Sequence, residues 1–134
     1  MKGYNNNIED LTLANTNFRE VLYTGKYAQL VLMSLKPGEE IGAEVHGGID
    51  QFFRFEAGEG KVIVDDNEYS VSDGSAVIVP AGANHNVINT SETEDLKLYT
   101  IYSPAEHKEG IIQATKEEAE ARHEQEQFDG QTTE

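Results

Sequence analysis

Short apolar segments, each closed by a glycine-, proline- or asparagine-containing turn, run along most of this chain. The candidate strands cover residues 18–24, 28–35, 41–46, 50–56, 61–65, 68–71, 76–79, 85–89 and 96–103. β-Branched and aromatic residues are frequent in them, and turn sequences such as Pro37-Gly38 and Asp73-Gly74 separate them. Many short strands at close spacing are typical of an antiparallel sandwich or barrel, so we expect an all-β fold.

The two ends of the chain differ from this middle part. Residues 1–17 are polar and rich in asparagine, and we expect them to form a loose arm. Thr115 and Glu118 fit a capping box at the start of a short helix, and beyond about Gln127 we expect a disordered tail. The expected organisation is an N-terminal arm at 1–17, a barrel at 18–114, and a helix with an acidic tail at 115–134, with flexible termini.

Strand alternation predicts which side chains face the barrel interior. If Gln51 points inward, Phe53 and Phe55 do so too. The same alternation places Asp50, Phe52, Arg54 and Glu56 on the outer face. Residues 30–33 are apolar on both faces, so something must cover their outer side. We expect a second copy of the chain, in a homodimer, to provide this cover; the terminal arm or helix is the alternative.

Composition excludes several kinds of partner. The 134 residues suffice for one domain, and the net charge of -15 disfavours nucleic acid and anionic membranes as partners. The absence of cysteine excludes disulfides, thiolate zinc sites and cysteine nucleophiles. No apolar run is long enough to span a membrane and the N-terminus lacks the apolar core of a signal peptide, so we expect a soluble, cytoplasmic protein.

Four side chains that can bind a metal lie in two short segments. Glu44 and His46 are two residues apart, so on a strand they share a face. Gln51 follows a turn-like sequence at residues 47–50, where a hairpin would bring it back opposite this pair, and His85 lies in the second segment. The pattern predicts a site inside the barrel at which donors from separate strands meet.

The same segments resemble the two cupin motifs. In the first, Gly38, Glu44, His46, Gln51 and Gly58 occupy the family's five positions, and in the second, Gly74, Pro80, Gly82, His85 and Asn89 do so. The resemblance covers residues 18–115 and is nearest to the small single-domain cupins called mannose-6-phosphate isomerase-like. It implies a cupin double-stranded β-helix, or jelly-roll barrel, with a metal held by the motif residues.

The resemblance also shows two departures. The family's first histidine is Glu44 here and its glutamate is Gln51, so the implied ligands are Glu44, His46, Gln51 and His85. Two imidazoles and a carboxylate suit one divalent transition metal, which we leave open among Zn, Mn, Fe, Ni and Co. The changed donor set weighs against the iron chemistry of the family.

Each ligand assignment has a simpler alternative. His46 and His85 could be ordinary core histidines bonded to the backbone, and Glu44 could be a solvated residue at the barrel rim. Gln51 could hold a metal-bound water or orient a ligand hydroxyl instead of binding the metal. We expect Asn89 to bond the backbone, His107 to lie in a loop, and His123 to face solvent on the tail helix.

Three functions are compatible with this site. The first is a metal-dependent, isomerase-like enzyme acting on a small polar molecule, sugar-like or hydroxy-carbonyl, in which Glu44 or a metal hydroxide would be the base. The others are a non-catalytic module that binds a metal or small ligand, and an Fe(II)-dependent dioxygenase. Outside the tail there are eight Lys and Arg residues against eighteen acids, and none lies inward within the motifs, so an unphosphorylated ligand fits better than a sugar phosphate.

Overall fold

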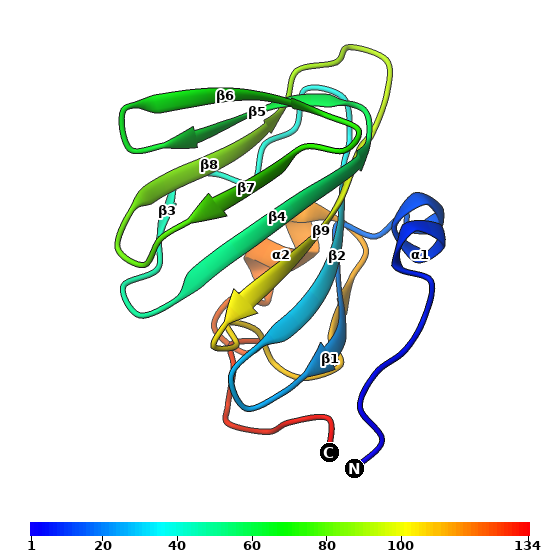
Figure 1. Cartoon of the computed structure of the whole chain (residues 1–134), viewed down its shortest axis with the longest axis vertical. Coiled ribbons are helices and arrows are strands. Elements are labelled where there is room, and N and C mark those ends of the chain that lie inside the picture. Colours follow the sequence, from blue (N-terminus) through cyan, green and yellow to red (C-terminus); the bar gives the residue numbers. More distant parts are fainter.

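Ten strands form two antiparallel sheets in the computed structural model, which describes residues 1–134 (Figure 1). The six-stranded sheet contains β1 (Arg19–Thr24), β2 (Gln29–Leu35), β4 (Asp50–Ala57), β7 (Ala76–Val79), β9 (Leu96–Ser103) and β10 (Ile112–Gln113), in the order β10-β1-β2-β9-β4-β7. The four-stranded sheet contains β3 (Glu44–Val45), β5 (Glu59–Val64), β6 (Asn67–Ser72) and β8 (Asn84–Asn89), in the order β3-β8-β5-β6. The expected all-β jelly roll is confirmed.

One face of each sheet builds the core. Phe55 of β4 lies opposite Leu98 of β9 in the large sheet, and Val62 of β5 lies opposite Val87 of β8 in the small one. All four side chains are fully buried, and each contributes about 1.5–3 kcal/mol by leaving water. The expected inward set of Gln51, Phe53 and Phe55 is confirmed. Glu56, expected on the outer face, pairs with Arg54 and is buried, next to a register shift in β4.

One strand is shorter than expected, and one short strand was not expected. The segment 41–46 contributes only the two residues of β3, since Gly42 has a φ of +108° and interrupts the extended backbone. The two-residue strand β10 was not expected, because Ile112 and Gln113 form too short a segment to be recognised as a strand. It extends the large sheet by pairing with the start of β1.

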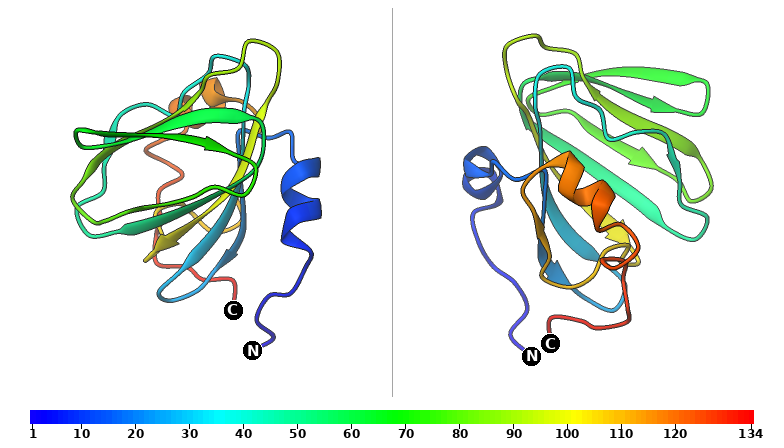
Figure 2. Two further views of the ribbon diagram at one scale, coloured as in Figure 1. Left: turned by 45° about the horizontal axis from the view of Figure 1, so that its top comes forward. Right: turned by 180° about the vertical axis from the view of Figure 1, so that it is seen from behind.

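The N-terminal arm contains a helix, α1 (Ile8–Ala14), and not only the loose chain expected from its composition. Asn7 caps it by accepting a hydrogen bond from the Asp10 amide, and the helix packs on the outer side of β2, β4 and β9 (Figure 2). Leu32 is thereby 2% exposed although it points away from the core. The apolar outer face is therefore covered by the arm, which was the alternative to a dimer partner, and this face no longer argues for a dimer.

The C-terminal helix α2 (Lys116–Ala121) forms where the capping box predicted it. The Thr115 hydroxyl accepts from the Glu118 amide, while the Glu118 carboxylate accepts from the Ala114 amide. Ala119 joins the core, so α2 lies on the inner side of the large sheet, opposite to α1 (Figure 2). Neither helix is long and apolar enough to cross a membrane.

Both termini make specific contacts in this structure. Thr133 exchanges hydrogen bonds with the backbone of Thr24 at the end of β1. The Glu134 carboxylate accepts from the Tyr23 hydroxyl at 2.6 Å and from the backbone amides of Lys2 and Gly3. The acidic tail thus lies along the β1–β2 end of the barrel, because backbone groups there provide partners that composition could not reveal.

Asn89 fastens two connections to the end of β8, as expected for a residue that bonds the backbone. Its amide nitrogen donates to the carbonyls of Leu35 and Lys36, both at 3.0 Å, and to that of Glu94 at 2.8 Å. Its oxygen accepts from the Ser91 amide. Removing this buried amide leaves several backbone groups without a partner.

We expect Asn89→Ala to lower the free energy of unfolding by about 2–4 kcal/mol, because each orphaned buried group costs about 1–3 kcal/mol. Urea denaturation followed by circular dichroism measures this loss. Asn84→Ala, at an exposed position on the same strand, is the control and should stay within about 0.5 kcal/mol of the parent protein. Equal effects of the two substitutions would contradict the assignment.

Candidate functional site

Glu44 and His85 lie side by side on adjacent strands of the small sheet. They are direct partners in the β3–β8 pairing, so their side chains point to the same face. Val45 between the two motif residues is 59% exposed, whereas the Glu44 and His46 side chains are 35% and 11% exposed. The two-residue spacing therefore directs Glu44 and His46 inward, as expected, even though the strand ends at Val45.

Gln51 approaches from the other sheet. It belongs to β4 and lies between Val79 of β7 and Tyr102 of β9, so the segment after His46 crosses from one sheet to the other. The expected hairpin between these residues is wrong: the glycines at 47 and 48 serve a crossover. Gln51 nevertheless faces the interior and is 2% exposed.

His46 is held between two carboxylates. Its Nε2 lies 3.0 Å from Oε2 of Glu44, and its Nδ1 lies 3.5 Å from Oε2 of Glu106. The His46 and His85 rings are 5.2 Å apart between centroids. The structure thus brings Glu44, His46 and His85 together, but Glu44 and His46 meet as a hydrogen-bonded pair, and no three His, Asp or Glu side chains form a ready set of metal ligands.

The pKa values of these groups follow from this arrangement. Burial acts to raise the pKa of Glu44, but the hydrogen bond to His46 and the nearby positive charges outweigh it, so the net shift is downward. The hydrogen bond to Glu44 raises the pKa of His46, against the effect of burial and with help from the charge of Glu106. Burial lowers the pKa of His85. His85 is therefore a neutral imidazole at pH 7, the form that binds metals.

Gln51 carries the clearest unsatisfied group of the site. Its Nε2 donates to the Thr100 hydroxyl at 3.0 Å, and that hydroxyl donates in turn to the Phe52 carbonyl at 2.8 Å. This chain fixes the amide so that Oε1 is a buried acceptor without any partner. A buried oxygen left unpaired is costly, and an amide oxygen can coordinate a divalent cation or bind the hydroxyl of a ligand. The residues present therefore fit a bound metal or ligand.

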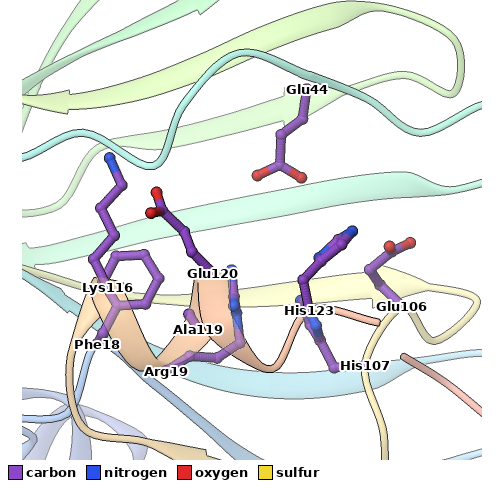
Figure 3. A pocket seen from close by; sticks show the side chains of 9 residues that line it. All are labelled: Phe18, Arg19, Glu44, Glu106, His107, Lys116, Ala119, Glu120 and His123. Atoms are coloured by element: carbon purple, nitrogen blue, oxygen red, sulfur yellow. The ribbon is translucent and has the colours of Figure 1, made fainter. Parts of the chain in front are cut away.

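A cavity of about 360 Å³ lies beside these residues, between the barrel and α2. In Figure 3, Glu44 reaches into it from the small sheet, and Glu106, His107 and His123 are grouped across from it. Arg19 lies in the middle next to Ala119, and Lys116 and Glu120 lie toward the other end. His123 lies just beyond α2 and contributes to this lining, so the expectation that it only faces solvent is incomplete. His107 comes from a loop, as expected, and reaches the barrel mouth.

Glu106 is a site residue that the sequence analysis missed. It contacts His46 through Nδ1, and burial raises the pKa of its carboxyl despite the opposing charge of His46. A carboxylate on the far nitrogen of a metal-binding histidine is a common arrangement that fixes the ring. Nothing in the sequence around Pro104 distinguishes this glutamate from the other acids of the chain.

Arg19 is the second residue that was missed. It is 8% exposed, and it lies opposite Met33 and Gln113, both of which are buried. Its Nη1 donates to Oε1 of Gln113 at 2.7 Å, and its Nε has no partner. Strand alternation could have revealed Arg19, because it lies two residues before the inward Val21 and therefore faces the barrel interior, outside both motifs.

The comparisons with known proteins agree with this architecture. The model of the family described as "Cupin domain" matches residues 31–102, a stretch that holds all four candidate ligands. The chain belongs to the cupin family. Its relatives include the uncharacterized protein YrkC of Bacillus subtilis (strain 168), which is 47% identical over 121 residues. That match covers 86% of this chain and 64% of YrkC, so the chain spans less than two-thirds of this relative.

Two further relatives cover most of this cupin. Protein L612 of Acanthamoeba polyphaga mimivirus is 44% identical over 109 residues, which is 79% of this chain and 68% of L612. The crystal structure of BH2720 from Bacillus halodurans is similar with a TM-score of 0.87 and 42% identity, covering 90% of this chain and 95% of that one.

Tyr102 and His107 form a pair beside the candidate ligands. The Tyr102 hydroxyl lies 3.1 Å from Nε2 of His107, and their rings meet edge to face at 5.0 Å; Tyr102 is fully buried and His107 is half-buried. Burial raises the pKa of Tyr102, so the phenol stays protonated, and burial lowers the pKa of His107 well below its usual value. His107 is therefore neutral in the folded cupin near pH 6, whereas in the unfolded chain it can bind a proton at that pH.

We expect the chelator-treated cupin to lose stability as the pH falls below 6.5, because the unfolded chain then binds a proton at His107 that the folded chain does not. The slope should reach about 1.4 kcal/mol per pH unit for this group. In His107→Gln the slope of the unfolding free energy against pH should be shallower by about 1.4 kcal/mol per pH unit, which is the contribution of one proton. Urea denaturation from pH 7.5 down to about pH 4.5 measures both; equal slopes would contradict the buried neutral state.

Proposed function

We propose that this cupin binds one divalent transition metal through Glu44, His46, Gln51 and His85 and uses it to hold a small polar molecule. The observation that supports this most directly is the buried, unpartnered Oε1 of Gln51, which points to a missing ligand in the barrel. The convergence of Glu44, His46 and His85 from the small sheet adds three donors of the appropriate chemistry. The narrower likeness to mannose-6-phosphate isomerase-like cupins remains a prediction.

The roles of the four residues follow from their surroundings. His85 would bind as a neutral imidazole, and His46 would exchange its contact with Glu44 for the metal while Glu106 holds its other nitrogen. Glu44 would supply the anionic donor and Gln51 a neutral oxygen. When bound, the metal would act as a Lewis acid toward a carbonyl or hydroxyl oxygen of the ligand.

Uptake of metal by the purified protein tests this proposal. Protein treated with a chelator is loaded with Mn(II), Fe(II), Co(II), Ni(II) or Zn(II) in turn and then desalted. Elemental analysis should then find about one retained ion per chain. The Co(II) form should also display the visible absorption of nitrogen- and oxygen-ligated cobalt. Failure to retain any of the five ions would overturn the metal site.

A proton-transfer enzyme is the activity that a specific observation favours. Glu106 borders the cavity, and burial raises the pKa of its carboxyl, a shift in the direction that suits a group that gives and takes a proton. Such a group can move a proton between carbons next to a carbonyl, as an isomerase requires. This supplies the acid–base residue that was missing from the sequence motifs, and it favours the enzyme over the non-catalytic binding module.

Deuterium exchange distinguishes the two functions. The metal-loaded protein is incubated in D₂O with a panel of aldoses and hydroxy-carbonyl compounds, and proton NMR follows loss of the signal next to the carbonyl. An enzyme should catalyse exchange, and Glu106→Gln should slow it by at least about 100-fold while metal is retained. Ligand binding without exchange would favour the binding module, and oxygen consumption by the Fe(II) form would favour the dioxygenase.

A further inference from the structure

Arg19 is a buried cation without an anionic partner. Its side chain lies on the inner face of the large sheet, borders the cavity and is 8% exposed. A guanidinium has five N–H donors, of which one is used on the neutral Gln113 and Nε is buried without any partner. Burying a charge without a counter-charge is unfavourable, so a folded protein keeps such a group only where another interaction or a function offsets this cost.

The other two arginines show the contrast. The Nε of Arg54 is also buried without a hydrogen bond, but it lies 3.5 Å from the Glu56 carboxylate, and Arg122 lies 2.7 Å from that of Glu118. Both are more exposed than Arg19, and Arg19 alone makes no ion pair within 4.0 Å. The most buried arginine of this strongly acidic chain is therefore the one without a carboxylate in direct contact. It lies over the Phe18 ring, 5.2 Å from the centroid, and its charge acts on Glu44 and Glu106 only from a distance.

The cavity around Arg19 is lined by charged side chains of both signs. Arg19 lies in the middle of the lining, where its charge acts on Glu44 and Glu106, and Lys116 of α2 lies farther along beside Glu120 (Figure 3). With a volume of about 360 Å³ the cavity suits a small molecule, near the lower end of the usual range of about 300–1,000 Å³ for ligand sites. A molecule that fills it can meet Arg19 and the candidate ligand Glu44 at the same time.

We propose that the cavity binds a small hydroxy- or oxo-carboxylic acid whose carboxylate pairs with Arg19 and whose hydroxyl or carbonyl oxygen faces Glu44 and His46. Guanidinium matches the planar carboxylate and pairs with it more strongly than with neutral groups. A phosphate would bring up to two negative charges next to Glu44, Glu106 and Glu120. A carboxylate brings only one, so these glutamates repel it less. The inference deepens the proposed function, on which it depends for the orientation of the ligand.

Lactate and its neutral amide, lactamide, test the charge requirement. Binding of each is measured by calorimetry and by saturation-transfer NMR, with the metal-loaded and the chelated protein. Wild-type protein should bind lactate at least about tenfold more tightly than lactamide, and Arg19→Gln should remove this difference. Arg54→Gln, which deletes an arginine already paired with Glu56 outside the cavity, should keep it within about twofold.

Several results would overturn the inference. These are equal binding of lactate and lactamide, absence of lactate binding in both metal states, retention of the preference in Arg19→Gln, or tighter binding of inorganic phosphate than of lactate. His85→Ala separates this inference from the metal proposal. An Arg19-dependent preference for lactate in a protein that takes up no metal supports the anion site without the metal, whereas metal uptake without that preference refutes the anion site alone.

Thermal unfolding provides a readout that a merely structural arginine would not share. If Arg19 awaits an anion, Arg19→Gln should leave the melting temperature of ligand-free protein unchanged or higher, because an unpaired buried charge has been removed. Added lactate should raise the melting temperature of the wild type but not of the variant. A lower melting temperature for ligand-free Arg19→Gln, together with unchanged lactate binding, would make Arg19 a structural residue and overturn its assignment.

Discussion

His46→Ala and His85→Ala should each abolish stoichiometric metal binding by this cupin. Each substitution removes an imidazole that lies within a cluster of polar side chains inside an otherwise apolar barrel. Loss of one imidazole from a site with two leaves the ion held by a single imidazole, a carboxylate and a weak amide oxygen, from which desalting should strip it. Elemental analysis after loading and desalting measures the loss directly.

Metal-dependent stability provides an independent measurement of the same loss. An ion that binds only the folded chain should stabilise the wild type by about 2.7 kcal/mol at 100 times its dissociation constant. Neither histidine variant should show a shift in melting temperature on addition of metal. If either variant retains full occupancy, that histidine is an ordinary core residue hydrogen-bonded to its surroundings.

Two further variants rank the remaining donors. Gln51→Ala should weaken metal binding less than loss of either imidazole, since an amide oxygen is a weak neutral donor. His123→Ala is the matched control, because this histidine borders the cavity at the chain's C-terminal part yet lies outside the proposed ligand set. If Gln51→Ala is as damaging as His85→Ala, the unpartnered oxygen of Gln51 is a principal ligand and the ranking is wrong.

The barrel could be predicted because its signals are local. Alternation along residues 50–56 and the turn residues between strands specify which face of β4 is buried, and Gln51, Phe53 and Phe55 follow it. Thr115 specifies the start of α2 in the same way. The position of α1 was not predictable, because a seven-residue helix takes its stability from packing on β9, β4 and β2 and not from its own sequence.

The candidate site could be predicted only as far as the motifs extend. Two-residue spacing placed Glu44 and His46 on one face, but the crossover between His46 and Gln51 depends on which sheet each strand joins. Glu106 reaches His46 because the loop after β9 folds back over the barrel mouth, a contact 60 residues distant in the chain. Sequence separation of this size leaves no local signal, so the acid near the site appears only in three dimensions.

Gly58→Ala should be among the most destabilising single substitutions in the barrel. Gly58 joins β4 to β5 with a φ of +91°, a conformation that costs other residues about 1–2 kcal/mol. A Cβ there would lie 2.4 Å from the Asp95 carbonyl oxygen and 3.0 Å from Cα of Leu96. Both neighbours are backbone atoms at the start of β9, so relief requires the strand to move, at a further cost of about 1–3 kcal/mol.

Gly74→Ala separates these two contributions, because Gly74 has nearly the same φ of +89° but no atom within 4 Å of the added Cβ. It should cost only the backbone strain, about 1–2 kcal/mol, whereas Gly58→Ala should cost about 2–5 kcal/mol. Urea denaturation of both variants at one pH measures the difference. Equal losses would mean that the start of β9 yields to the extra methyl group, so that the first-motif glycine is required for its backbone angle and not for the close approach of Asp95.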